Sequence, residues 1–115
     1  MNMTPESRYY RLEGTIPVPC TVLEWAEAFK RADRIVAQTN LSPTVRVSTV
    51  FLGLDHSFDP NGPPMLFETM IFGIENDEYL TRCGTWEQAL AMHEAALNHC
   101  YITLEVEIEE RHDPR

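Results

Sequence analysis

The sequence predicts an α+β fold, an antiparallel meander sheet of four to six strands with two helices packed on one face. Two segments begin with the pattern of a helix N-terminal capping box and continue with apolar side chains at helical spacing. Between them, stretches of strand character are separated by turn-forming residues. The chain has no internal repeat and no low-complexity segment, so we expect a single domain over residues 1–115, with residues 1–7 as a loose lead-in.

The first element, over residues 10–18, is predicted to be an edge strand. Gly14 is expected to break or bulge this strand. Pro17 and Pro19 are expected to stop it, because proline cannot donate a hydrogen bond to a neighbouring strand.

Two helices are predicted from their capping boxes. In the first helix, the Thr21 hydroxyl and the Glu24 carboxylate can satisfy free backbone amides, and the helix is expected to run to about residue 33. The second helix follows Gly84, opens with a box over residues 85–88 and is expected to run to about residue 98. Apolar side chains recur at steps of three and four residues in both helices, so each helix must face a sheet.

Four strands of an antiparallel meander are predicted between the helices, over residues 34–40, 44–54, 65–73 and 78–82. Two segments, 50–52 and 70–72, are apolar on both faces, which is more than a sheet covered on one side requires. We therefore expect either that the second face is also covered, or that two copies of the chain meet there as a homo-oligomer.

A further strand is predicted over residues 102–108, where apolar and polar residues alternate and which could pair with the N-terminal strand. In such a strand, carboxylates would lie on one face about 6.8 Å apart, two residues of strand rise. This regular row of charge could imitate nucleic acid; alternatively, it is a solvated edge that discourages aggregation. The residues concerned are Glu105, Glu107, Glu109 and Glu110.

Composition limits the classes of partner. Eighteen acidic against nine basic side chains give a formal charge of −9, which repels nucleic acid and anionic lipid, so we expect no direct nucleic-acid partner. The same charge suits solubility, or attraction to a basic partner such as a nucleic-acid-binding protein. The three cysteines share no short spacing, and no signal-peptide pattern or membrane-spanning apolar run is present, so a cytoplasmic location is expected and membrane insertion is not.

One cluster of polar residues could form a site at the mouth of the loop over residues 57–64. Asp55 and His56 end one central strand, Glu68 lies on the returning strand, and Arg82 follows on the next. They could build a binding or acid–base site, because histidine titrates near neutral pH. Alternatively, Asp55 and His56 cap the loop and Glu68 is a solvated strand residue, since we expect Glu68 opposite Phe51 or Leu52, away from His56.

The pattern predicts no metal site and no cofactor. His93 and Cys100 are two helical turns apart, and the spacing of four residues that a helical zinc site prefers is missing around His99. We expect a half-buried histidine beside a buried cysteine. A glycine-rich phosphate loop, a nucleophile elbow and a serine or cysteine with a nearby histidine are also missing from the sequence.

Three segments resemble a family of small uncharacterised proteins encoded by tailed bacteriophages and prophages. They are residues 47–56 (VSTVFLGLDH), residues 62–73 (GPPMLFETMIFG) and residues 85–87 (TWE) with Ala89 and His93. The likeness covers about residues 9–97 and departs from the family pattern at Ile74, Cys83 and the acidic C-terminal segment. The resemblance implies a phage or prophage origin and expression in the bacterial host cytoplasm; it supplies no activity.

Two hypotheses follow. The preferred one is a non-enzymatic phage accessory protein that binds a host protein, such as a component of a bacterial defence system, through an acidic surface. The alternative is a small-molecule-binding protein or minor enzyme that holds a nucleotide or similar metabolite at the mouth formed by Asp55, His56 and Glu68. An anionic ligand would then need Arg8, Arg46 or Arg82 in the pocket.

Overall fold

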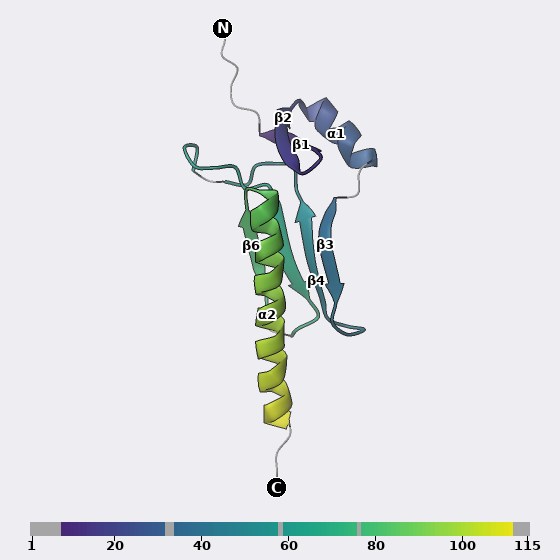
Figure 1. Ribbon diagram of the computed structural model, residues 1–115, viewed down its shortest axis with the longest axis vertical. Helices are drawn as coiled ribbons and strands as arrows, with labels where there is room; N and C mark the ends of the chain where they lie inside the picture. The colour runs from purple at the N-terminus through teal and green to yellow at the C-terminus, as the bar shows by residue number, and fades with distance from the viewer. Residues whose placement is uncertain (1–7, 32–33, 58, 76, 112–115) are drawn as a thin grey trace.

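The computed structural model describes residues 8–31, 34–57, 59–75 and 77–111, and the predicted lead-in over residues 1–7 lies outside this part. The described residues form two helices, a two-stranded antiparallel hairpin and a four-stranded antiparallel sheet, which confirms the α+β class (Figure 1). In chain order the elements are β1 (Tyr9–Glu13), β2 (Ile16–Cys20), α1 (Val22–Arg31), β3 (Ile35–Asn40), β4 (Arg46–Phe51), β5 (Phe67–Phe72), β6 (Leu80–Cys83) and α2 (Trp86–Arg111).

The N-terminal hairpin corrects the prediction of one interrupted strand. Gly14 adopts a φ of 65°, and the chain turns there so that β1 and β2 pair antiparallel. Pro19 lies opposite Tyr10, whose N–H donates to the carbonyl of Gly53 at 2.7 Å, away from β2. Tyr10 and Pro19 are therefore a non-hydrogen-bonded pair, in which both residues direct their backbone groups away from the partner strand. The backbone of Pro19, and that of Pro17 two residues earlier, thus faces the free edge of β2. The prolines therefore lie within an edge strand, where a missing N–H is tolerated.

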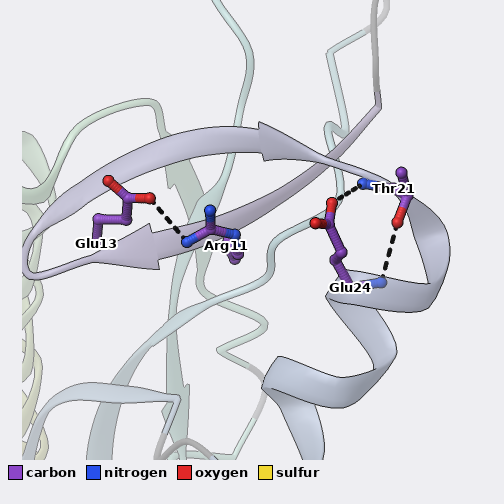
Figure 2. A network of polar contacts seen from close by, with 4 residues as sticks. All are labelled: Arg11, Glu13, Thr21 and Glu24. Atoms are coloured by element: carbon purple, nitrogen blue, oxygen red, sulfur yellow. Dashed lines mark hydrogen bonds and ion pairs between the residues drawn. The ribbon is translucent and has the colours of Figure 1, made fainter.

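The first predicted capping box is confirmed (Figure 2). The backbone N–H of Thr21 donates to Glu24 Oε1 at 2.8 Å, and the N–H of Glu24 donates to Thr21 Oγ1 at 3.1 Å. The bond from the Thr21 N–H to the carboxylate, with a further contribution from the Thr21 side chain, favours the charged form and lowers the pKa of Glu24. On β1, beside the box, Arg11 and Glu13 form an ion pair at 2.9 Å.

Helix α1 packs on the hairpin at one end of the four-stranded sheet (Figure 1). The ring of Trp25 lies between Tyr9, at a centroid distance of 5.4 Å, and Phe29, at 4.3 Å. Phe29 also packs against the buried cluster around Phe67. The predicted helical stripe thus joins the hairpin to the core; the last predicted positions, 32–33, lie outside the described residues.

The four predicted central strands are confirmed as β3, β4, β5 and β6, which pair in that order as an antiparallel meander. A bulge between Ile35 and Ala37 interrupts the pairing of β3 with β4. Side chains alternate between an inner face, which is buried, and an outer face. The buried inner residues include Val47, Thr49, Phe67 and Ile71, among others.

Helix α2 covers the inner face. It opens with the second predicted capping box, in which the N–H of Gln88 donates to Thr85 Oγ1 at 3.1 Å and Gln88 Oε1 accepts from the N–H of Thr85 at 3.2 Å. Its buried residues Ala89, Ala96 and Cys100 complete two apolar clusters with the inner strands. Neither of the described helices is both long enough and apolar enough to cross a membrane.

The C-terminal segment corrects another prediction, because residues 102–108 continue α2 as helix. The apolar residues of this segment continue a helical stripe that passes through Ala96, Cys100 and Leu104, instead of forming one face of a strand. Leu104 packs against the buried cluster that contains Val45 and Ile71. No proline or glycine interrupts the chain between residues 86 and 111. Figure 1 shows this part of α2 running past the end of the sheet.

Candidate functional site

The outer face of the four-stranded sheet carries an unusual number of apolar side chains. Opposite residues in the register point to the same side, so this face can be followed from strand to strand. Its apolar members are Ile35, Val50, Met70, Phe72 and Leu80, and its charged members are Arg46, Glu68 and Arg82. We call these eight residues the open sheet face.

Several large side chains of the open sheet face remain in solvent. Ile35 is 46% exposed, Leu80 44% and Phe72 38%. The guanidinium of Arg46 lies over the ring of Phe72, 4.7 Å from its centroid. A shallow hollow of about 100 Å³ opens between Val50, Met70 and their neighbours. The described part of the chain does not cover this face, so the first of the two expectations is not met within these residues. The second, contact between two copies of the chain, stays a prediction.

Two of the three charged residues of the open sheet face form a cross-strand pair. Glu68 lies opposite Arg82, and Arg82 Nε donates to Glu68 Oε2 at 3.0 Å. Glu68 also lies opposite Val50, which corrects the expected register at Phe51 or Leu52 by at least one residue. The carboxylate is therefore neutralised by Arg82 on the outer face instead of facing the loop mouth.

Asp55 and His56 hold the mouth of the loop. Asp55 Oδ1 accepts the N–H of Ser57 at 2.8 Å and the N–H of Met65 at 2.9 Å, so one carboxylate oxygen joins both ends of the loop. His56 donates its backbone N–H to the carbonyl of Met65 at 3.1 Å. Arg8 reaches the carbonyl of Asp55 at 2.8 Å. Of the two interpretations of Asp55 given above, these bonds support the loop cap.

The four residues proposed from the sequence thus fall into two sets. Asp55 and His56 organise the loop, whereas Glu68 and Arg82 pair on the open sheet face. The hydrogen bonds of these four residues do not join Asp55 or His56 to Glu68 or Arg82. Acid–base chemistry at one shared site would need such a pair to exchange a proton.

The polar centre of the inner face was not predicted. His93 is only 4% exposed, and its Nε2 lies 2.9 Å from Thr39 Oγ1 while its Nδ1 lies 2.8 Å from Thr49 Oγ1. The Thr49 hydroxyl continues the chain to Thr69 Oγ1 at 2.5 Å. Both ring nitrogens are satisfied by hydroxyls, as a buried imidazole requires. We call these four residues the threonine–histidine network.

The threonine–histidine network predicts acid sensitivity. Burial lowers the pKa of His93, and nearby Glu94 opposes this only in part; the strand groups that His93 contacts are uncharged threonines. The unfolded chain, with its ordinary pKa of 6.5, therefore takes up a proton before the folded chain does. Burial of neutral His93 therefore contributes fully to the stability of the folded chain above pH 6.5. This contribution is lost as the pH falls below 6.5 and through the lower pKa of the folded chain.

We expect the free energy of unfolding, measured with urea, to fall between about pH 7.5 and about pH 5.5. His93→Gln should reduce this fall, while the matched variant His99→Gln, which removes a more exposed histidine, should retain it. Equal pH dependence in wild type and His93→Gln would contradict the assignment.

The residues weighed as metal ligands are engaged elsewhere. His99 Nε2 lies 2.7 Å from Asp77 Oδ2, and its ring packs against that of Tyr79 at a centroid distance of 4.8 Å and a tilt of 41°. Cys100 is fully buried, and burial raises the pKa of its thiol, with a further contribution from the charge of Asp77. Within the described ranges, three or more histidine, cysteine or carboxylate side chains do not come together in a way that could hold an ion.

A larger hollow lies where β6 borders α2. Its volume is about 510 Å³, and it is lined by Met65, Arg82, Cys83, Gln88 and Met92, among others. The thiol of Cys83 is half-buried here, and burial raises its pKa. The sequence alone does not reveal this hollow, because its shape depends on how α2 lies against the edge strand β6.

The acidic C-terminal residues Glu105, Glu107, Glu109 and Glu110 belong to the last turns of α2. Successive helical residues are rotated by about 100°, so alternate positions do not share a face as they do in a strand. The regular row of carboxylates predicted at strand spacing is therefore wrong.

Comparison of the chain with protein-family models, with curated proteins and with solved structures finds no significant match. The site must therefore be interpreted from its own geometry and chemistry.

Proposed function

We propose that this chain is a non-catalytic accessory protein of bacteriophage or prophage origin that binds a host protein in the bacterial cytoplasm, with the open sheet face as its contact surface. The observation that carries this proposal is the exposure of Ile35, Phe72 and Leu80 together on one face of the central sheet. Exposed apolar surface rimmed by charge is typical of protein interaction sites.

The chemistry of the polar residues supports binding over catalysis. The Asp55 carboxylate accepts backbone N–H groups of the loop, and Glu68 forms an ion pair with Arg82. Both ring nitrogens of His93 are hydrogen-bonded to threonine hydroxyls. A catalytic acid or base must instead be available to a substrate.

The charge of the chain favours a basic host partner, such as a nucleic-acid-binding protein or a defence component. A formal charge of −9 steers a positively charged partner toward the chain over distances that apolar contacts do not reach. The acidic residues of α2, Glu105, Glu107, Glu109 and Glu110, add to this field, and the open sheet face would supply the short-range contact.

The proposal predicts which variants lose partner capture. We expect the double variant Met70→Gln, Phe72→Gln to reduce capture of the host protein at least about ten-fold, because apolar anchors dominate interface energies. The matched control, Val22→Gln with Leu23→Gln, removes apolar side chains that are 48% and 76% exposed on α1 and should bind as wild type does. Capture from bacterial lysate by immobilised protein, quantified by mass spectrometry at low and high salt, measures this.

The result that contradicts the proposal is equally specific. A host protein retained by wild type and control but not by the double variant supports the open sheet face. Equal retention by all three proteins, or no specific retention by wild type, would remove it. Changing the four C-terminal glutamates to glutamine should weaken capture mainly at low salt, because screened long-range attraction contributes little at high salt.

A second candidate function, binding of a small molecule, is favoured by the hollow of about 510 Å³ beside Arg82. Met65 lines this hollow and is held by Asp55 and His56, so the loop mouth contributes to its shape. A nucleotide that binds there should raise the melting temperature of wild type more than that of Arg82→Gln. No shift across a panel of nucleotides and related metabolites would exclude this candidate.

A further inference from the structure

The edge strand β6 has backbone groups that the sheet does not use. The N–H of Ile71 donates to the carbonyl of Tyr79 at 3.4 Å, and the register then makes Thr69 and Thr81 a hydrogen-bonded pair. Leu80 and Arg82 take the alternate positions, so their N–H and C=O groups point away from β5. In the described sheet, the strand order ends at β6 and leaves this side open.

The other edges carry devices that prevent pairing, whereas β6 is regular. At β2, Pro17 and Pro19 occupy the outward-facing backbone positions. At β3, the bulge between Ile35 and Ala37 distorts the edge. At β6, the outward positions belong to Leu80 and Arg82, and both can donate and accept ladder hydrogen bonds.

An unpaired hydroxyl lies at the centre of β6. Thr49, Thr69 and Thr81 follow one another across the inner face in register, and the first two hydroxyls hydrogen-bond each other. Thr81 Oγ1 is buried and has no hydrogen-bond partner among the described residues. A buried polar atom without a partner is rare and calls for an explanation.

We propose that the free edge of β6 pairs with β6 of a second copy of this chain, through a two-fold symmetric antiparallel contact centred on Thr81. The outward N–H and C=O groups of Leu80 then bond those of the partner's Arg82. By symmetry, the groups of Arg82 bond those of the partner's Leu80. The two Thr81 residues lie directly opposite each other, where Cβ atoms are about 4.5–5.5 Å apart. A rotation about χ1 lets their hydroxyls bond each other, as those of Thr49 and Thr69 do.

Side chains on both faces suit this register. On the outer face, Arg82 has its charge held by Glu68, and its aliphatic stem lies against the partner's Leu80, which is 44% exposed in the single chain. On the inner face, Cys83 lies across from the partner's Tyr79, next to the hollow of about 510 Å³. The two open sheet faces become one continuous surface. The pairing does not depend on which partner that surface binds.

Cysteine cross-linking tests the register. In a Cys83→Ser background, Thr81→Cys places two thiols opposite each other, so mild oxidation should convert most of the protein to a disulfide-linked dimer on a non-reducing gel. The control Leu80→Cys faces the partner's Arg82 and should cross-link at least about five-fold less. Equal cross-linking of the two variants would overturn the register.

Mass measurement tests the pairing itself. Multi-angle light scattering of the wild-type chain should give twice the monomer mass of 13.2 kDa at high concentration and the monomer mass on dilution. Leu80→Pro removes an outward-facing N–H without removing a bond to β5, and should weaken association at least about ten-fold. The matched control Gln38→Pro removes the equivalent N–H at the free edge of β3 and should associate as wild type does.

Circular dichroism establishes that both proline variants fold. A wild-type chain that stays monomeric at all concentrations overturns the proposal. So does a dimer that both proline variants weaken equally. A dimer lost in Met70→Gln, Phe72→Gln but retained in Leu80→Pro would place the contact on the open sheet face and would also overturn it.

Discussion

Replacing Gly73 by alanine is expected to destabilise the chain by about 4 kcal/mol or more, a loss reached only through steric overlap or a serious buried defect. Gly73 has a φ of 98°, in the region that residues with a side chain rarely adopt. A Cβ at this position would overlap the carbonyl oxygen of Thr44 in the turn between β3 and β4. Because the obstacle is backbone and not a flexible side chain, relief requires the turn to move away from the end of β5.

Gly14→Ala separates the steric cost from the conformational one. Gly14 also has a positive φ, of 65°, yet no heavy atom lies within 4 Å of a Cβ placed there. This variant should lose only about 1–2 kcal/mol, the cost of a left-handed backbone for an L-residue. Urea unfolding of both variants measures the difference. If Gly73→Ala cost no more than Gly14→Ala, the close approach of Thr44 to β5 would be wrong.

The same position matters for the proposed contact surface. Gly73 directly follows Phe72, which the Arg46 guanidinium covers from the neighbouring strand. A displaced turn would move Arg46 relative to Phe72 and change that end of the open sheet face. Partner capture by a partially destabilised Gly73 variant is therefore not a clean test of the surface, whereas Phe72→Gln combined with Met70→Gln is.

Local signals account for the parts of the fold that were predicted. Thr21 with Glu24, and Thr85 with Gln88, form their capping bonds within three residues of each other, so sequence spacing is sufficient to find them. The turn-rich segments likewise separate β4, β5 and β6 without reference to the rest of the chain.

Predictions failed where two local signals competed. Around residues 102–108, apolar residues fit both a period of two and the continuation of a helical stripe. Packing of Leu104 on the cluster that contains Val45 decides for the helix, and that contact is between residues distant in sequence. Pro17 and Pro19 were expected to end a strand because proline cannot donate a ladder hydrogen bond. They are tolerated because they face the free edge of β2, and this cannot be known before the pairing of β1 with β2 is known.

The candidate site shows the same division. The consecutive apolar residues at 50–52 and 70–72 indicated that both faces of the sheet are apolar, and the exposed Phe72 agrees with this. The partner of Glu68, however, depends on the register across a loop, and an error of one residue moves a side chain to the other face. The threonine–histidine network is harder still to predict from the sequence, because His93 contacts Thr39 and Thr49 only when α2 packs on the sheet.

His93→Ala is expected to lose about 3–5 kcal/mol of stability, from the cavity left by the ring and from stranded hydroxyls. Thr39 and Thr49 would each lose their bond to an imidazole nitrogen, and the Thr49 hydroxyl is fully buried whereas that of Thr39 is partly buried. A purely structural network can be replaced as a unit, because apolar groups of similar shape leave no unpaired polar atom. The quadruple variant Thr39→Val, Thr49→Val, Thr69→Val, His93→Leu should therefore recover most of the stability that His93→Ala loses.

The quadruple variant also separates structure from function. It keeps the open sheet face, so it should capture the same host protein as wild type, and it should lack the part of the acid sensitivity that His93 supplies. Chemical unfolding at two pH values and capture from lysate are the measurements. A folded quadruple variant that no longer captured the partner would show that the threonine–histidine network takes part in recognition, and its assignment as a purely structural network would have to be abandoned.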